Sequence, residues 1–219
     1  KRQGEMIHEL HSVLNGELRD TPAGLAAYPG GYNPACSDGI VSCRAHLTHG
    51  WKTNLFVNGE KLKMPPKFKA HSHEDMRLFF HGRKLMASCT VAHEYGRHKI
   101  KCATVFGQLK SSLEGWELTE VKQPTYGRND WRGMEKNWLF FSHKEQLYAI
   151  YGIKEKRQIV LELSDSGKVL KTHKVTAPAW KFGEIRGGCA PLPHPSGHLL
   201  RFFHSRTTER GDIPFRYHI

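Results

Sequence analysis

Short stretches in which apolar and polar residues alternate follow one another along most of the chain. Gly, Pro, Asn and Asp separate these stretches, and the longer periodicity of amphipathic helices is almost missing. Alternation with a period of two is typical of β-strands with one buried face. The main stretches are GIVSCRAHL, LFVNGEKL, MRLFF, KLMASCTVA, KIKCATVFGQL, NWLFF, QLYAIYGI, QIVLEL, KVLKTHKVT and HLLRFFHS. The pattern predicts an all-β protein, with tight turns at Asn58–Gly59 and in SDSGK. Only EMIHELHSVLNGEL fits a short helix, or a strand followed by a loop.

Four segments of the chain share one order of features. They begin near residues 33, 74, 135 and 187, and read NPACSDGIVSCRAH, EDMRLFFHGRKLMASCT, EKNWLFFSHKEQLYAIYGI and GGCAPLPHPSGHLLRFFHS. Each opens on a polar or Gly-rich motif and continues through a short strand, a turn and a second strand. Unequal periods of roughly 40–60 residues suit the four-stranded blades of a β-propeller with variable loops. A sandwich has a similar density of strands but does not explain the polar motif before each first hairpin.

The repeated polar motif predicts a shared site. In a propeller the innermost strands line a central channel, so residues at their entrances converge on one face. One motif alone fits a local ion pair between Asp75 and Arg77, but four motifs in register favour a common site. The prediction is therefore a single propeller over residues 1–219, with Glu74, Asp75 and Arg77 at the mouth of its channel.

Composition limits the class of protein. A hydrophobic content of 38% with 11% aromatic residues is enough for a core, and no apolar run approaches the length of about 18 residues that would span a membrane. The net charge of +12 comes from scattered Lys and Arg, without a long basic run or zinc-finger spacing. Only the net charge therefore supports nucleic-acid binding, which makes it the weakest of three hypotheses for the function. The first residues lack an initiator Met and an apolar signal region, so a processed chain or a piece of a longer one is expected.

The cysteines and histidines offer no clear metal or redox site. The chain has five cysteines, and no two of them form a CxxC motif. They are Cys36, Cys43, Cys89, Cys102 and Cys189. Their strand-like surroundings predict buried free thiols in a reducing compartment, hence a cytoplasmic protein, with a Cys36–Cys43 disulfide as the open alternative. His71 and His73 could touch one metal from a loop, but solvated or substrate-facing roles are favoured. No metal and no cofactor is expected.

Taken in order, the motifs resemble a known enzyme family. The order NP…R, EDxR, a Lys-Asn strand and GG-x-x-P before a strand ending in FFH resembles glycoside hydrolase family 130, over roughly Asn33 to Ile219. That family comprises mannoside phosphorylases and mannosidases with a five-bladed β-propeller, and related propellers include mannosyltransferases. The resemblance implies a five-bladed β-propeller here. The chain ends where a fifth-blade strand would begin, so an incomplete last blade is expected.

The resemblance also implies roles for individual residues. Asp75 in EDMR matches the family's proton donor to the glycosidic oxygen, and Arg77 is expected to orient the same site. The implied substrate-binding positions are Asn33, Arg44, Arg77, Lys136, Asn137, Arg186 and His204. Aromatic side chains that could stack on a sugar ring are Tyr32, Trp131 and Trp138, the last of which equally fits the core.

This sequence departs from the family at several places. Phosphorylases of the family carry a His-Arg pair after the third motif, where this chain has Tyr151 and Gly152. The usual Pro of the acidic motif is Met76, and the usual Thr after the Gly pair is Cys189. These differences argue against a phosphorylase more than against a hydrolase or a transferase.

The chemistry expected of such a site is glycosidic cleavage with inversion. It needs an acid that keeps its proton near neutral pH, and water activated by a base, or phosphate, on the opposite face of the sugar. Asp75 is the candidate acid, and Glu135 and Asp130 are candidates for a base from their position alone. The expected partner is a carbohydrate substrate, with phosphate or a phosphorylated sugar donor as further candidates. The alternative is a propeller that binds glycans or a protein without catalysis.

Overall fold

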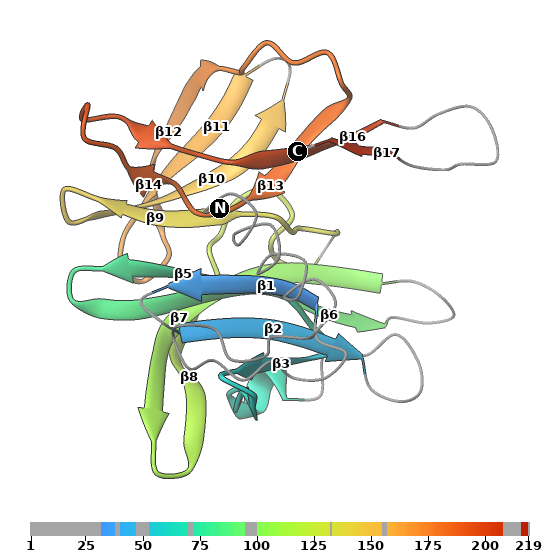
Figure 1. Ribbon diagram of the computed structural model, residues 1–219, viewed down its shortest axis with the longest axis vertical. Coiled ribbons are helices and arrows are strands. Elements are labelled where there is room, and N and C mark those ends of the chain that lie inside the picture. Colours follow the sequence, from blue (N-terminus) through green and yellow to red (C-terminus); the bar gives the residue numbers. More distant parts are fainter. Residues whose placement is uncertain are drawn as a thin grey trace, which may run out of the picture. The chain divides into compact units, whose positions relative to one another are not determined.

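The computed structural model is built almost entirely of β-strands (Figure 1). It describes residues 32–37, 40–46, 53–69, 72–94, 100–131, 133–154, 157–207 and 216–218. Among them the one helical element is a single 3-10 turn, η1 (Pro66–Phe68), so the all-β prediction is confirmed. No helix in these ranges is long and apolar enough to cross a membrane. The chain divides into two compact units, Lys1–Lys136 and Asn137–Ile219, and the predicted helix or strand in EMIHELHSVLNGEL lies outside the described residues.

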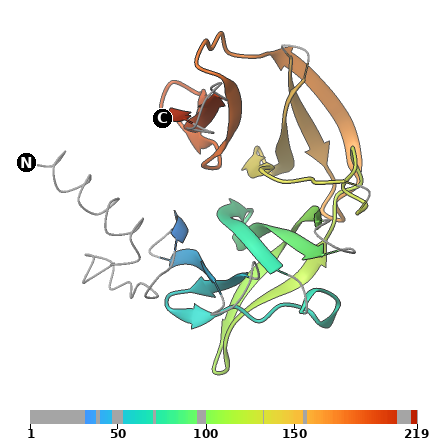
Figure 2. The same ribbon diagram turned by 90° about the vertical axis from the view of Figure 1, so that its right-hand side faces the viewer.

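The first unit holds two four-stranded antiparallel sheets whose strands pair in chain order. The first sheet comprises β1 (Tyr32–Ser37), β2 (Ile40–His46), β3 (Thr53–Val57) and β4 (Glu60–Lys61). The second comprises β5 (Ser72–His81), β6 (Lys84–Glu94), β7 (Ile100–Ser112) and β8 (Gly115–Lys122). The β7–β8 hairpin, drawn in green, extends well beyond the other strands of its sheet (Figure 1, Figure 2). Asn58 and Gly59 form the β3–β4 turn with φ of 48° and 82°, as predicted for an Asn-Gly hairpin.

The core of the first unit lies between its two sheets. Leu55 and Val57 of β3 pack in one apolar cluster with Met76 and Leu78 of β5. The remaining buried members are Leu62, Phe68, Ala87, Cys89, Val91, Val105, Leu109 and Leu118. Each fully buried Val, Leu or Met side chain contributes about 1.5–3 kcal/mol, so this cluster is the main stabilising contact of the unit.

The second unit repeats the same kind of sheet. Its four-stranded sheet runs β9 (Leu139–His143), β10 (Gln146–Lys154), β11 (Arg157–Leu163) and β12 (Val169–Thr176) in chain order. A three-stranded sheet follows, with β13 (Glu184–Gly188), β16 (Phe203–Thr207) and β17 (Arg216–His218), and a short hairpin joins β14 (Leu192–Pro193) to β15 (Leu199–Leu200). The predicted SDSGK turn is confirmed between β11 and β12, with Gly167 at a φ of 85°.

Two of the cysteines show what burial does to a thiol. Cys89 and Cys102 are free and buried, as predicted, whereas the side chains of Cys36 and Cys43 lie outside the described part of the chain. Burial raises the pKa of Cys89 to about 12 and is the main reason why the pKa of Cys102 rises to about 11.

Alkaline pH is therefore expected to destabilise the protein through Cys89. In the unfolded chain this thiol ionises near its ordinary pKa of 9.0, whereas in the folded chain it keeps its proton to about 12. Its contribution is thus fully present below pH 9 and is lost as the pH rises toward 12. Urea unfolding at pH 8 and pH 10 measures the loss, and Cys89→Ala should show a smaller loss. An equal pH dependence in the variant would contradict this assignment.

Candidate functional site

The EDMR motif forms a β-bulge in β5. The ladder to β6 shifts register between Glu74 and Arg77, so Asp75 and Met76 stand opposite the single residue Cys89. Asp75 adopts a φ of 51°, in the left-handed region that Asp and Asn tolerate better than other non-glycine residues. Such strained positions cluster at functional sites, where surrounding contacts hold them in place.

The bulge decides where each side chain of the motif goes. Met76 turns into the core of the first unit and is 3% exposed, which leaves Asp75 as the extra, partly buried residue. Arg77 donates a hydrogen bond from Nη1 to the carbonyl oxygen of Asp75 at 2.7 Å. The guanidinium thus holds the backbone of the bulge.

The same shift brings two charged side chains to one face. Glu74 pairs with Thr90 and Arg77 pairs with Ser88, and these two partners are two residues apart on β6. Residues two apart on a strand share a face, so Glu74 and Arg77 also share one, although three positions separate them in sequence. A regular strand would have placed them on opposite faces.

Equivalent positions recur in the other three motifs. The register shifts between Tyr32 and Ala35 in β1 and between Ile185 and Gly188 in β13. In the third motif, two residues precede the first pair of β9, and the first of them has a φ of 65°. The residues that hold the place of Asp75 are Asn33 in β1, Asn137 before β9 and Arg186 in β13.

Each unit brings two of these motifs close together. In the first unit, β1 lies against β5. In the second unit, a Cβ atom on Gly187 would lie 3.0 Å from both the Cβ and the carbonyl oxygen of Asn137. A Cβ on Gly188 would collide with the carbonyl oxygen of Phe202. The Gly pair of the fourth motif is therefore needed for close approach to neighbouring segments.

Charged groups of the first unit gather around the thiol of Cys102. The positive charge of Lys136 lowers the pKa of this thiol, and the negative charges of Glu74 and Glu135 raise it, in addition to the larger effect of burial. The backbone N–H of Glu135 donates to the carbonyl of Cys102 at 3.1 Å. Lys136 and Glu74, which come from different motifs, therefore lie near the same point of the second sheet.

A buried asparagine, Asn129, holds the segment between β8 and β9 that carries Glu135 and Lys136. Asn129 accepts from the N–H of Thr104 at 2.6 Å, and its amide group donates to the carbonyls of Thr104 and Pro124 at 2.9 and 2.8 Å. It is 2% exposed, and its bonds to Thr104 and Pro124 attach the segment after β8 to β7. The sequence did not single out this residue, since an Asn in a polar loop is ordinary.

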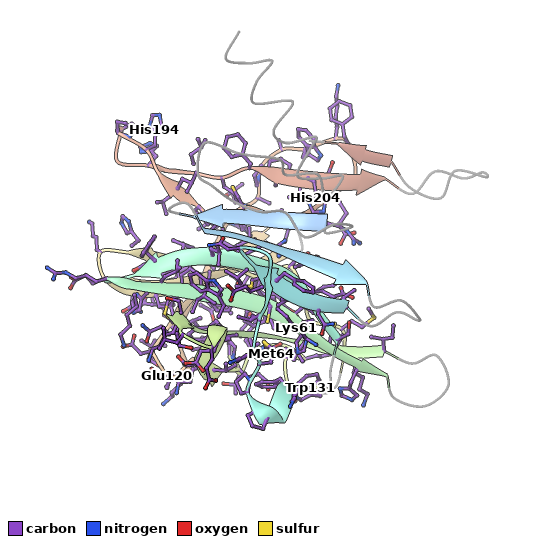
Figure 3. All side chains as sticks on the ribbon, turned by 60° about the horizontal axis from the view of Figure 1, so that its bottom comes forward. Lys61, Met64, Glu120, Trp131, His194 and His204 are labelled. Atoms are coloured by element: carbon purple, nitrogen blue, oxygen red, sulfur yellow. The ribbon has the colours of Figure 1, made fainter. Side chains whose placement is uncertain are left out.

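In the second unit, two arginines lie at the fourth motif. Arg186 donates from Nε and Nη2 to Glu184 Oε2 at 3.1 and 2.7 Å. Arg201, which the sequence did not single out, donates to the carbonyl of Arg186 at 3.3 Å and to Gln158 Oε1 at 2.8 Å. His204 lies on β16 opposite the register shift of β13, and His194 lies in the turn between β14 and β15 (Figure 3).

Several sequence expectations need correction or lie outside the described side chains. His73 is part of β5 rather than of a loop and is 3% exposed. Its Nε2 lies 2.9 Å from the carbonyl oxygen of Phe68, which suits a structural role better than that of a metal ligand.

Trp138 is 1% exposed and therefore belongs to the core. Trp131 is partly buried and, like Met64, packs against the core of the first unit (both labelled in Figure 3). Across the described ranges, no group of three His, Cys, Asp or Glu residues could hold a metal ion. The structure does not describe the side chains of Tyr32, Asn33 and Arg44, or any part of His71.

No family model matches the sequence, and no curated protein matches it. A crystal structure of an alpha-L-arabinofuranosidase from Lactobacillus brevis is similar to this chain with a TM-score of 0.39 and 11% sequence identity, over 68% of this chain and 54% of that one. The chain thus spans about half the length of that structure. The likeness is too distant to assign a fold family or an activity.

Proposed function

We propose that this protein is a carbohydrate-active β-propeller that acts on mannosides or related glycosides, with Asp75 as the general acid. The observation that carries the proposal is the bulge in β5. It lifts Asp75 off the strand ladder in a left-handed conformation, beside Glu74 and Arg77. The motif that resembles the acid motif of glycoside hydrolase family 130 is therefore also the strained point of its strand.

A propeller of five blades is the fold that we propose for the whole protein. The support is that three sheets have four strands paired in chain order, as propeller blades do, and that the fourth motif begins a further sheet. Asn33, Asp75, Asn137 and Arg186 hold the same place at the start of their sheets. In such a propeller these four positions would face one channel.

The proposed reaction is cleavage of a glycosidic bond with inversion. The carboxyl of Asp75 gives its proton to the glycosidic oxygen as the bond to the anomeric carbon breaks. Water or an acceptor hydroxyl attacks that carbon from the other face and loses a proton to a base. Arg77 positions Asp75, and Lys136 supplies positive charge near the substrate. The sugar hydroxyls are bound by the remaining positions, which are Asn33, Arg44, Asn137, Arg186 and His204.

Phosphate is the less favoured acceptor. The place of the family's phosphate-holding His-Arg pair is taken here by Tyr151 and Gly152, and the ring of Tyr151 packs edge-on against Trp138 at 5.1 Å. This side chain is engaged in core packing. The same observation supports the alternative function, a propeller that binds a glycan or a protein without turnover.

Incubation of the protein with β-mannobiose and longer manno-oligosaccharides, with and without phosphate, tests the proposal. Free mannose without phosphate is the expected product of a hydrolase. A transferase is expected to form longer oligosaccharides only when an activated donor, such as a nucleotide sugar or a sugar phosphate, is also supplied. Mannose 1-phosphate formed only with phosphate would refute the preference for hydrolysis or transfer. Binding in a glycan screen without any product would favour the alternative, and neither binding nor product would contradict a carbohydrate function.

A further inference from the structure

The carbonyl groups of two bulges are held in the same way. In β5, Arg77 Nη1 donates to the carbonyl of Asp75 at 2.7 Å. In β13, Arg201 Nη2 donates to the carbonyl of Arg186 at 3.3 Å. Asp75 and Arg186 occupy equivalent places in their strands. Because the extra residue of a bulge is left out of the strand ladder, its carbonyl needs another donor, and here a guanidinium provides it.

The two arginines come from different parts of their sheets. Arg77 follows Asp75 on the same strand, whereas Arg201 lies in the segment just before β16. Arg201 also donates to Gln158 Oε1 on β11 at 2.8 Å. It therefore connects the bulge of β13 to the neighbouring four-stranded sheet of the second unit.

The placement of Arg201 does not favour stability. The side chain of Arg201 is largely buried, and burial lowers its pKa. Both of its acceptors, Gln158 Oε1 and the backbone carbonyl of Arg186, are neutral. Its Nε is buried and makes no hydrogen bond within the described part of the chain. Desolvating a guanidinium without full compensation is costly, and an apolar side chain of similar length would often cost less. The bond to the Arg186 carbonyl is what such a replacement could not supply.

We propose that Arg201 is a positioning residue for the carbohydrate site. It holds the backbone of Arg186 and so fixes the direction in which Arg186 presents its side chain, as Arg77 fixes Asp75. This role deepens the proposed function and rests on it. Arg201 itself need not touch the substrate, because it acts through the backbone of the residue that does.

Arg201→Met is expected to loosen the bulge without unfolding the unit. Hydrogen exchange of peptides covering 184–188 and 203–205 should rise by roughly 5- to 10-fold, the loss expected for one hydrogen bond, while residues 159–163 keep their protection. The melting temperature should stay within about 2 °C, since removal of a desolvated cation offsets the lost bonds. KM for the manno-oligosaccharide should rise by roughly 3- to 10-fold with a smaller change in kcat.

Two further variants sharpen the test. Arg201→Lys keeps one hydrogen-bond donor, so its KM should rise less than that of Arg201→Met. A purely steric role would not predict this difference. Lys174→Met removes an exposed charge from β12 of the same unit and should change neither exchange nor KM.

Three results would overturn the proposal. They are unchanged exchange at the bulge, a general rise in exchange across the second unit with a large fall in melting temperature, and a local rise in exchange with unchanged KM. If the unsubstituted protein neither binds nor cleaves carbohydrate, the proposed function fails and the positioning role fails with it. The exchange data then still decide whether Arg201 holds the bulge, so the two failures are distinguishable.

Discussion

Asp75→Asn is expected to lower the rate of glycosidic cleavage by roughly 10²- to 10⁴-fold, the usual contribution of a general acid. An amide of nearly the same shape has no proton to give to the leaving oxygen. The bulge should remain, because Asn tolerates the left-handed φ of 51° as Asp does. The bond from Arg77 goes to the backbone carbonyl of this residue and is therefore kept.

The nature of the leaving group separates a general acid from a binding residue. The nitrophenolate of a nitrophenyl mannoside is a good leaving group and needs little help from an acid. The loss of rate in Asp75→Asn should therefore be much smaller with nitrophenyl mannosides than with manno-oligosaccharides. Both rates are measured beside Asp165→Asn, which changes an exposed carboxyl in the β11–β12 turn and should leave them unchanged. An equal deficit with both substrates would show that Asp75 binds or orients the sugar. A normal rate with manno-oligosaccharides would remove it from the site.

The fold could be predicted where local chemistry decides it. The Asn58–Gly59 turn follows from backbone preferences of two adjacent residues, and alternation in QIVLEL follows from one buried face. In β11 the buried residues are Ile159, Leu161 and Leu163, every second position. These signals depend on neighbours in sequence, so they survive without knowledge of the tertiary structure.

The bulges could not be predicted in the same way. EDMR contains no Gly, and strict alternation would have placed Glu74 and Arg77 on opposite faces. The register shift arises because Met76 turns into a core that β3 helps to build. This is a tertiary contact between two sheets. The motif marked the right residues, but their directions depend on packing that the sequence does not display.

The residues that were missed share this cause. Asn129 and Arg201 act on backbone groups 25 and 15 positions away in sequence. Asn129 belongs to no repeated segment, and Arg201, although it lies within the fourth one, holds no position that the four segments share. For Trp138 the sequence left two roles open, sugar stacking and core packing, and the structure places it in the core.

Trp138→Ala is expected to destabilise the second unit by about 3–5 kcal/mol, the cost of truncating a large buried aromatic side chain. Trp138 is 1% exposed, stacks on Phe140 with ring centroids 6.2 Å apart, and meets the ring of Tyr151 edge-on at 5.1 Å. Removal of the indole would leave a cavity that neighbouring β-strands cannot close without breaking ladder hydrogen bonds. Urea unfolding measures the loss, and Phe182→Ala, at an aromatic residue that is 42% exposed, should cost much less.

The same variant decides between packing and sugar recognition at the third motif. Trp138 follows Asn137, which lies close to Gly187 of the fourth motif, so a collapsed cavity should also displace Asn137 and weaken carbohydrate binding. Loss of binding should then track loss of stability and recover where a smaller cavity is left, as in Trp138→Phe. If Trp138→Ala kept its unfolding midpoint and lost only binding, the indole would be a sugar platform and not part of the core. Because an indole in the core cannot stack on a ligand, the two outcomes exclude each other.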